Sequence, residues 1–205
     1  VDRFAANSRF IQQRIRKVWR RDAEVIHPPV ETGIFTPSLE IDSHYLWVGQ
    51  MVPYKRPDLA VDAFNANGLP LLMVGTGGMA KSLRARARPN ITFIERLDFN
   101  ALRRAYARAR ALVMTAEEDF GITPVEAMAS GRPVVAYGRG GVLDSVVPDR
   151  TGIFFERQDP DSLIEAVERM ERFMPHFDPR DAIEQANLFA PETFDRKITE
   201  LARLD

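Results

Sequence analysis

The chain has 205 residues, 45% of them hydrophobic and 28% charged, which is typical of a soluble globular protein with a substantial core. Its formal net charge of −1 gives no overall attraction to nucleic acid or to an anionic membrane, so no nucleic-acid partner is expected. The chain contains no cysteine, which excludes disulfides and thiol catalysis and favours a reducing compartment. No apolar run approaches the ~20 residues that span a bilayer. Arginines at helical spacing between residues 84 and 110 are interpreted as solvated helix faces.

The segment 1–43 is expected to form a strand, a helix and a second short strand, followed by a connector. Val1–Ala6 has the composition of a strand, and Ser8 fits the cap of the helix that follows. After a short strand at Ala23–Ile26, the turn-rich stretch that begins at His27 shows no periodicity, and its lone histidine is interpreted as structural. Because the chain opens inside a strand and without methionine, we expect it to be cut from a longer one.

From residue 44 onward, short apolar runs alternate with amphipathic segments, which predicts a doubly wound parallel sheet with helices on both faces. Ligands of such sheets bind where the strands end, so the loops after the strands should carry the function. The expected strands are Tyr45–Val48, Leu71–Val74, Ile91–Ile94, Ala111–Met114, Val134–Ala136 and Ile153–Phe155. The expected helices are Arg56–Asn65, Met79–Arg88, Asn100–Arg108, Val125–Ser130, Pro160–Phe173, Pro179–Leu188 and Glu192–Leu204.

The loop after the first of these strands begins with Gly49 and Gln50 and presents two cations, Lys55 and Arg56, before a helix that starts with proline. This arrangement suits a clamp for a diphosphate. A surface turn with two exposed basic residues accounts for it equally well. The next strand is followed by a glycine-rich loop that opens at Gly75, but this loop lacks the full G-x-G-x-x-G pattern of dinucleotide-binding proteins.

The most informative loop runs over residues 116–126, between a buried strand and a helix. Thr123, followed by proline, fits a helix cap, and Glu126 three residues later would complete a capping box. The same segment permits a second interpretation. Gly121 lets a ligand approach the backbone, the amides of Ile122 and Thr123 form an anion site, and Glu126 accepts hydrogen bonds from ribose hydroxyls. From the residues alone, both interpretations of Glu126 stay open.

Three successive carboxylates, Glu117, Glu118 and Asp119, stand at the start of this loop. They fit either a solvated loop tip or a metal site. Histidine is absent from the loop, and the neighbouring helix end favours anions over cations. We therefore expect no metal here.

The run from Glu118 to Glu126 matches the E-x7-E pattern of retaining GT-B-fold glycosyltransferases of family 4, within a longer similar stretch that ends at Ala136. The resemblance covers nearly the whole chain and is most specific over residues 44–156. Its other parts follow in the family's order at Val25–Val30, Val48–Arg56, Val74–Gly77, Gly140–Asp144 and Thr151–Phe155.

This resemblance implies an enzyme of two Rossmann-like halves with a donor-binding cleft between them. The present chain would be the C-terminal half: residues 1–43 would be the end of the preceding domain and the connector, and residues 44–205 the nucleotide-sugar-binding domain. The N-terminal GT-B domain would be missing. On its own, the chain is expected to bind nucleotide but to transfer sugar poorly or not at all.

The resemblance also implies roles for individual residues. Glu126 would hold the ribose, Glu118 would contact hydroxyls of the donor sugar, and Lys55 would neutralise the diphosphate. The catalytic residues would be Glu118 and Lys55. The expected donor-binding residues are Gly49, Gln50, Arg56, Gly75, Arg96, Leu97, Phe120, Gly121, Ile122, Thr123 and Glu126.

One departure from the family pattern concerns the phosphate cations. Many members carry arginine where this chain has Gln50, so one positive charge is missing from its usual place. Arg56, beside Lys55, is a candidate replacement, although consecutive residues at a helix start point in different directions.

The function implied is transfer of a hexosyl group from a nucleotide sugar to a glycan or lipid-linked acceptor, with retention of configuration and without a cofactor. The stretches at 52–56 and 118–122 resemble members that use GDP-mannose, which we favour over UDP-sugars. A cytoplasmic location is expected, with peripheral contact at the inner membrane face left open. A nucleotide-sugar-binding module without turnover is the main alternative, and an NAD-dependent oxidoreductase domain is the weaker one.

Overall fold

Six parallel strands form the central sheet, in the order β5-β4-β3-β6-β7-β8. The computed structural model describes residues 3–203. Apolar β-branched and aromatic residues dominate the strands, and most of them are buried, which suits a sheet covered on both faces. The strands are β3 (Tyr45–Val48), β4 (Leu71–Val74), β5 (Ile91–Ile94), β6 (Leu112–Met114), β7 (Val134–Tyr137) and β8 (Gly152–Phe155).

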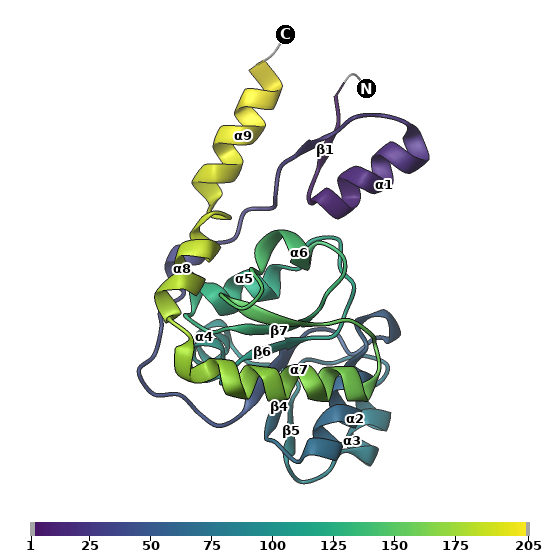
Figure 1. Ribbon diagram of the computed structural model, residues 1–205, viewed down its shortest axis with the longest axis vertical. Coiled ribbons are helices and arrows are strands. Elements are labelled where there is room, and N and C mark those ends of the chain that lie inside the picture. Colours follow the sequence, from purple (N-terminus) through teal and green to yellow (C-terminus); the bar gives the residue numbers. More distant parts are fainter. Residues whose placement is uncertain (1–2, 204–205) are drawn as a thin grey trace.

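Helices cover both faces of this sheet, as Figure 1 shows. On one face, α2 (Pro57–Asn67), α3 (Ala80–Arg86) and α7 (Pro160–Phe173) contribute to a core that contains Tyr45 and Trp47 of β3. On the other face, α4 (Phe99–Arg108), α5 (Ile122–Ala129) and α8 (Pro179–Asn187) contribute to a core that contains Leu46. Successive residues of β3 therefore enter opposite cores, which is the two-sided burial expected of a doubly wound fold.

The predicted fold class is confirmed, and the six expected strands all form within one residue of their expected ends. The largest difference among the helices is at α5, which begins at Ile122 instead of Val125. A short helix, α6 (Val142–Ser145), and three 3-10 turns were not expected. The turns are η1 (Thr32–Ile34), η2 (Pro53–Lys55) and η3 (Met174–His176). The expected strand at Val1–Ala6 and helix end at Leu204 fall partly outside the described residues.

A smaller unit precedes the sheet and lies at the same end of the molecule as the last helix (Figure 1). It consists of β1 (Ala5–Ala6), α1 (Arg9–Trp19) and β2 (Glu24–Val25), and its two strands pair in parallel. Arg3 donates a hydrogen bond to the carbonyl of Leu201 in α9 (Pro191–Arg203), which joins the two ends of the chain.

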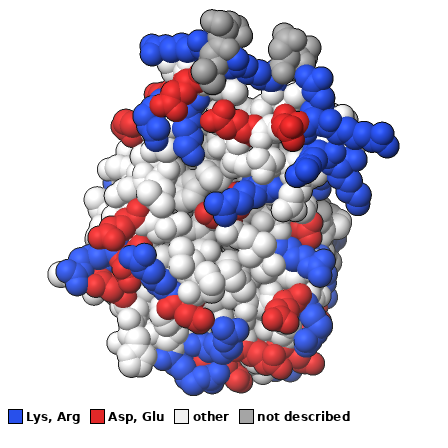
Figure 2. All heavy atoms as spheres, turned by 45° about the horizontal axis from the view of Figure 1, so that its top comes forward, with Lys and Arg blue, Asp and Glu red and all other residues white. Residues whose placement is uncertain are grey.

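The surface of this end is unevenly charged. Helix α1 contains basic but no acidic side chains. Figure 2 shows basic side chains gathered at the upper right, on the side of the molecule where α1 lies. By contrast, several of the arginines expected on solvated faces form ion pairs: Arg84 with Glu95, Arg86 with Asp62, and Arg108 with Glu40 and Asp42. Among the described residues, no helix has the length and apolar character needed to cross a bilayer.

The order of the strands determines where a ligand can enter. In chain order, β3 comes first; β4 and β5 then follow on one side of it, and β6, β7 and β8 follow on the other side. The loops that leave β3 and β6 therefore diverge, and a crevice opens between them at the carboxyl ends of the strands.

Candidate functional site

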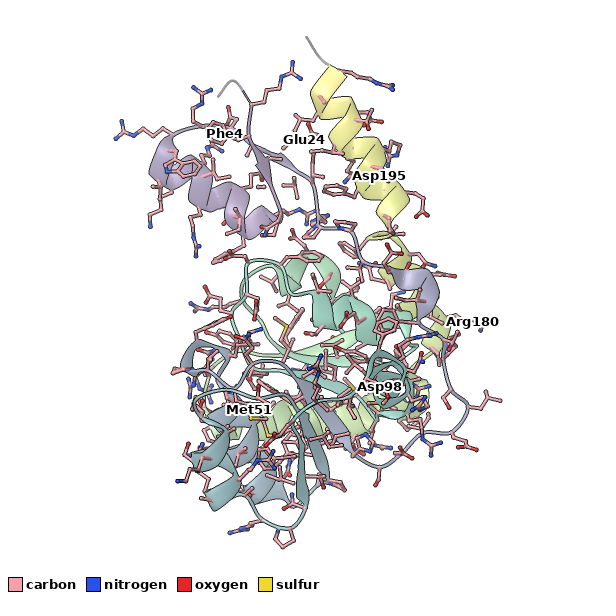
Figure 3. The ribbon with its side chains drawn as sticks, turned by 180° about the vertical axis from the view of Figure 1, so that it is seen from behind. Phe4, Glu24, Met51, Asp98, Arg180 and Asp195 are labelled. Carbon is pink, nitrogen blue, oxygen red and sulfur yellow. The ribbon has the colours of Figure 1, made fainter. Side chains whose placement is uncertain are left out.

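A cleft of about 900 Å³ opens at the carboxyl ends of β3, β4 and β5. Its floor is formed by the ends of β3 and β4, and one side is formed by the segment between β5 and α4. Figure 3 labels Met51, in the loop after β3, and Asp98, at the start of α4. Of the residues expected at the site, Gly49, Gln50, Lys55, Gly75, Arg96 and Leu97 line this cleft.

A second hollow of about 330 Å³ lies beside the cleft and shares Lys55 with it. The expected residues that line it are Glu118, Phe120, Gly121, Ile122 and Thr123. Asn7 and Pro28 complete its wall from the segment that precedes the sheet. Lys55 thus lies between the cleft and the second hollow, and an extended ligand could occupy both.

Lys55 and Glu118 form an ion pair between the two loops that diverge from the sheet. The Lys55 Nζ lies 3.0 Å from the Glu118 Oε1, and the two side chains are 24% and 25% exposed. Partial exposure leaves both groups accessible to a ligand while the pair restricts their orientation. The structure therefore brings together the two residues that sequence reasoning assigned to catalysis.

Thr115 supports this pair and was missed by the sequence analysis. It is fully buried directly after β6, and its hydroxyl donates a hydrogen bond of 2.7 Å to the carbonyl of Lys55. The indole of Trp47 donates to the same hydroxyl at 3.1 Å, and the amide of Gln158 donates to the Thr115 carbonyl at 2.8 Å. A buried threonine after a strand carries no local signal of such a role, because its partners are distant in the sequence.

The N-terminus of α5 faces the second hollow. The cap residue is Gly121, with φ of 86°, and in the described part of the chain no side chain caps this helix. Thr123 is the second helical residue and Glu126 lies a full turn inside the helix, so the capping-box interpretation of Glu126 is wrong. The first amides of α5 are consequently oriented toward the hollow without a side-chain acceptor, and the helix dipole adds positive potential there.

Glu126 is held by a side chain from the neighbouring helix. The hydroxyl of Tyr106, on α4, donates a hydrogen bond of 2.7 Å to the Glu126 Oε2. Burial raises the pKa of Glu126 above its ordinary value, and the hydrogen bond from Tyr106 acts in the opposite direction. Burial, followed by the nearby carboxylate, raises the pKa of Tyr106 well above its ordinary range, so this hydroxyl remains a donor.

The loops after β6 and β7 are joined through their backbones. The amide of Gly141 donates to the carbonyl of Glu118 at 2.8 Å, and Glu118 forms an isolated parallel bridge with Gly140. A Cβ at Gly141 would lie 2.2 Å from the Asp119 carbonyl oxygen, so only glycine permits this approach. The backbone position of Glu118 is therefore fixed by its neighbours, independently of its side chain.

Arg56 is not brought to the cleft with Lys55. Its guanidinium binds Asp58 at 3.0–3.2 Å and the carbonyl of Gln158 at 3.4 Å, and it lines a separate hollow beside α3. The cause is local: Arg56 has φ of 51°, and this left-handed residue turns the chain between η2 and α2. Arg56 therefore does not replace the cation that is absent at Gln50.

The three carboxylates of the loop also separate. Glu118 faces Lys55, while Asp119 lies 3.5 Å from Arg14 of α1 and Glu117 is exposed. Within residues 3–203, no three His, Asp or Glu side chains gather as metal ligands would. The expectation that the site works without metal stays a prediction.

His27, in the connector, contacts the loop that contains Glu118. Its ring lies 5.5 Å from that of Phe120 and 5.1 Å from that of Phe189, and its Nε2 lies 3.0 Å from Asp144 of α6. Asp144 also accepts a hydrogen bond from the backbone amide of Arg9 at the start of α1. These contacts give His27 a structural role between the connector and the loop that contains Glu118.

Comparison with known proteins agrees with this architecture. The family model for "Glycosyl transferases group 1" matches residues 42–172. An uncharacterized glycosyltransferase of Methanocaldococcus jannaschii is 27% identical over 172 residues, which cover 81% of this chain and 48% of the relative. A GDP-mannose-dependent alpha-mannosyltransferase of Mycobacterium tuberculosis is 32% identical over 133 residues, which cover 62% of this chain and 35% of the relative. The chain thus spans about half the length of these curated relatives, or less.

Among solved structures, Anabaena HepE in complex with UDP and glucose aligns with a TM-score of 0.85 at 20% identity, covering 100% of this chain and 64% of that one. The sheet order, the two-sided core and this likeness define the fold as that of GT-B glycosyltransferases. The chain belongs to the glycosyl transferase group 1 family.

Proposed function

We propose that this chain is the donor-binding half of a retaining glycosyltransferase, which transfers a hexosyl group from a nucleotide sugar to a glycan or lipid-linked acceptor. The observation that carries the proposal is the Lys55–Glu118 pair, which lies between the cleft and the second hollow. In this arrangement the nucleoside occupies the cleft, near Arg96 and Leu97, and the sugar occupies the hollow beside Glu118.

The chemistry required is stabilisation of a departing nucleoside diphosphate. Lys55 supplies a positive charge, and the first amides of α5, at Ile122 and Thr123, supply hydrogen-bond donors where negative charge develops. Loss of one such donor typically costs ~10²–10³ in rate. Glu118 acts in this proposal by orienting hydroxyls of the donor sugar, a positioning role that differs from the paired carboxylates of glycosidases.

GDP-mannose is the donor that we favour. The support is the 32% identity to a relative that is named GDP-mannose-dependent, together with the resemblance of the stretches at 52–56 and 118–122. HepE was solved with UDP and glucose, which makes UDP-sugars the competing donors.

A second Rossmann-like half completes the enzyme in this proposal. An apolar groove of about 370 Å³ lies along α1, and both Val18 and Trp19 on its rim are more than half exposed. An apolar face of this kind is typical of a surface that another domain covers.

We also place the enzyme in the cytoplasm, which the absence of cysteine supports.

The experiment that tests the proposal is calorimetric titration of the chain with GDP-mannose, GDP, UDP and NADH. The proposal predicts binding of GDP-mannose with 1:1 stoichiometry and weaker binding of UDP. Tight binding of NADH with none of GDP or UDP would favour the oxidoreductase alternative. For the complete enzyme, the anomeric configuration of the product, followed by NMR, distinguishes retention from inversion.

A further inference from the structure

Tyr106 is fully buried on α4, yet its hydroxyl, the only polar group of the side chain, contacts Glu126, the carboxylate that the sequence assigned to the ribose. We propose that Tyr106 is a positioning residue, which holds Glu126 as an acceptor for the ribose hydroxyls and thereby sets the preference of the site for ribonucleotides over 2′-deoxyribonucleotides. This inference rests on the proposed function, because it requires that a nucleotide occupies the cleft.

The position of Tyr106 is fixed by its surroundings. Its ring packs edge-on against Phe35 at a centroid distance of 5.9 Å. Leu102, one turn earlier on the same face of α4, lines the cleft. Figure 3 shows Asp98, which caps this helix through the amide of Ala101. Helix α4 thus begins beside the expected base contacts and ends beside Glu126, so one rigid element relates the two.

The hydrogen bond occupies only part of the acceptor capacity of Glu126. An ionised carboxylate has about four acceptor positions, and Tyr106 uses one of them on Oε2 at 2.7 Å. The remaining positions can accept two neighbouring hydroxyls, as the 2′ and 3′ groups of ribose present them. Because burial makes the ionised form of Glu126 costly, the donor that stabilises it has a direct effect on how well it accepts.

The structure offers a matched control for the hydroxyl of Tyr106. Tyr45, on β3, is also fully buried, and its hydroxyl donates to Glu171 at 2.5 Å. That pair belongs to the opposite core, away from the cleft. Tyr106→Phe and Tyr45→Phe therefore remove the same group from the same kind of hydrogen bond, but only the first removes it from the carboxylate assigned to ribose.

The test is calorimetric titration of wild type and both variants with GDP and with 2′-deoxy-GDP, or with the uridine pair if only UDP binds. We expect wild type to prefer the ribonucleotide by about tenfold, and Tyr106→Phe to reduce that preference to about twofold by weakening ribonucleotide binding. Tyr45→Phe should keep the full preference. Circular dichroism and thermal unfolding establish that each variant is folded.

A thermodynamic cycle distinguishes a role through Glu126 from a general effect on the fold. If Tyr106 acts by positioning Glu126, its replacement has no further effect on ribose preference in the Glu126→Gln background. A folded Tyr106→Phe variant that keeps the full preference for the ribonucleotide would overturn the inference. So would loss of the preference in Glu95→Gln, because Glu95 lines the cleft and is the competing ribose acceptor. If wild type binds neither GDP nor UDP, the proposed function itself fails.

Discussion

The Nζ of Lys55 lies 3.0 Å from the Oε1 of Glu118, and this pair spans the loops that follow β3 and β6. These are the two strands at which the order of the sheet reverses. The carbonyl of Lys55 is held by the buried hydroxyl of Thr115, and the carbonyl of Glu118 by the amide of Gly141. Both charges are therefore presented from a fixed backbone to the crevice where ligands of such sheets bind.

Replacing Lys55 with methionine should weaken diphosphate binding while leaving the nucleoside contacts intact. The side chain keeps its length but loses its charge, and hydrogen bonds to charged groups contribute about 1.5–3 kcal/mol. We expect GDP affinity to fall by about 10- to 100-fold in calorimetric titration. Guanosine affinity should not change. Equal losses for GDP and guanosine would show that Lys55 does not contact the phosphates.

The neighbouring cation provides the control for this prediction. Arg56 is bound to Asp58 and faces a separate hollow. Arg56→Met should consequently leave GDP affinity unchanged, even though it removes the same charge one residue away. A loss comparable to that of Lys55→Met would return Arg56 to the site.

Replacing Glu118 with glutamine should affect the donor sugar more than the fold. Exposed or partly exposed ion pairs contribute only about 0–1 kcal/mol to stability, and the backbone bridge to Gly140 does not need the side chain. We expect the melting temperature to change little while GDP-mannose binds less tightly relative to GDP. A marked loss of melting temperature with unchanged GDP-mannose affinity would contradict this prediction and give Glu118 a structural role.

The contact between the loops after β6 and β7 can be tested with one methyl group. Gly141→Ala places a Cβ 2.2 Å from the Asp119 oxygen and 2.4 Å from the Phe120 Cα, which forces the loops apart. We expect a loss of about 1–3 kcal/mol in the free energy of unfolding, together with weaker nucleotide binding. Gly78→Ala is the matched control, because nothing lies within 4 Å of its added Cβ. Similar losses in both variants would mean that steric contact is not the cause.

The partly buried carboxylate of Glu126 should make stability depend on pH. Burial raises its pKa in the folded state above the ordinary value of 4.5. Its contribution to stability is therefore complete below that value and is lost as the pH rises through the folded pKa. Glu126→Gln should accordingly gain melting temperature relative to wild type as the pH rises above 4.5, while nucleotide affinity falls. A difference that is constant with pH would show that Glu126 titrates normally.

The sheet could be predicted from the sequence because each strand is a short apolar run bounded by turn residues. Tyr45–Val48, Leu71–Val74 and Ile91–Ile94 form with the expected ends. The loop residues at the cleft followed from the same pattern, since parallel strands place their carboxyl ends at one edge. Gly49 and Gly75 lie there as expected.

The start of α5 and the direction of Arg56 could not be predicted in the same way. Thr123 with proline has the local preference of a cap, but Gly121 can adopt the positive φ that begins the helix earlier. The left-handed backbone at Arg56 turns its side chain toward Asp58. Thr115 and Tyr106 act on residues far away in the chain, and only the assembled fold brings them together.

The most direct test of the central claim is a crystal structure of this chain with GDP-mannose. We predict diphosphate oxygens within hydrogen-bond distance of the Lys55 Nζ and of the first amides of α5, with the sugar beside Glu118. A nucleotide bound away from Lys55 and α5, or crystals grown in excess donor that contain none, would contradict it.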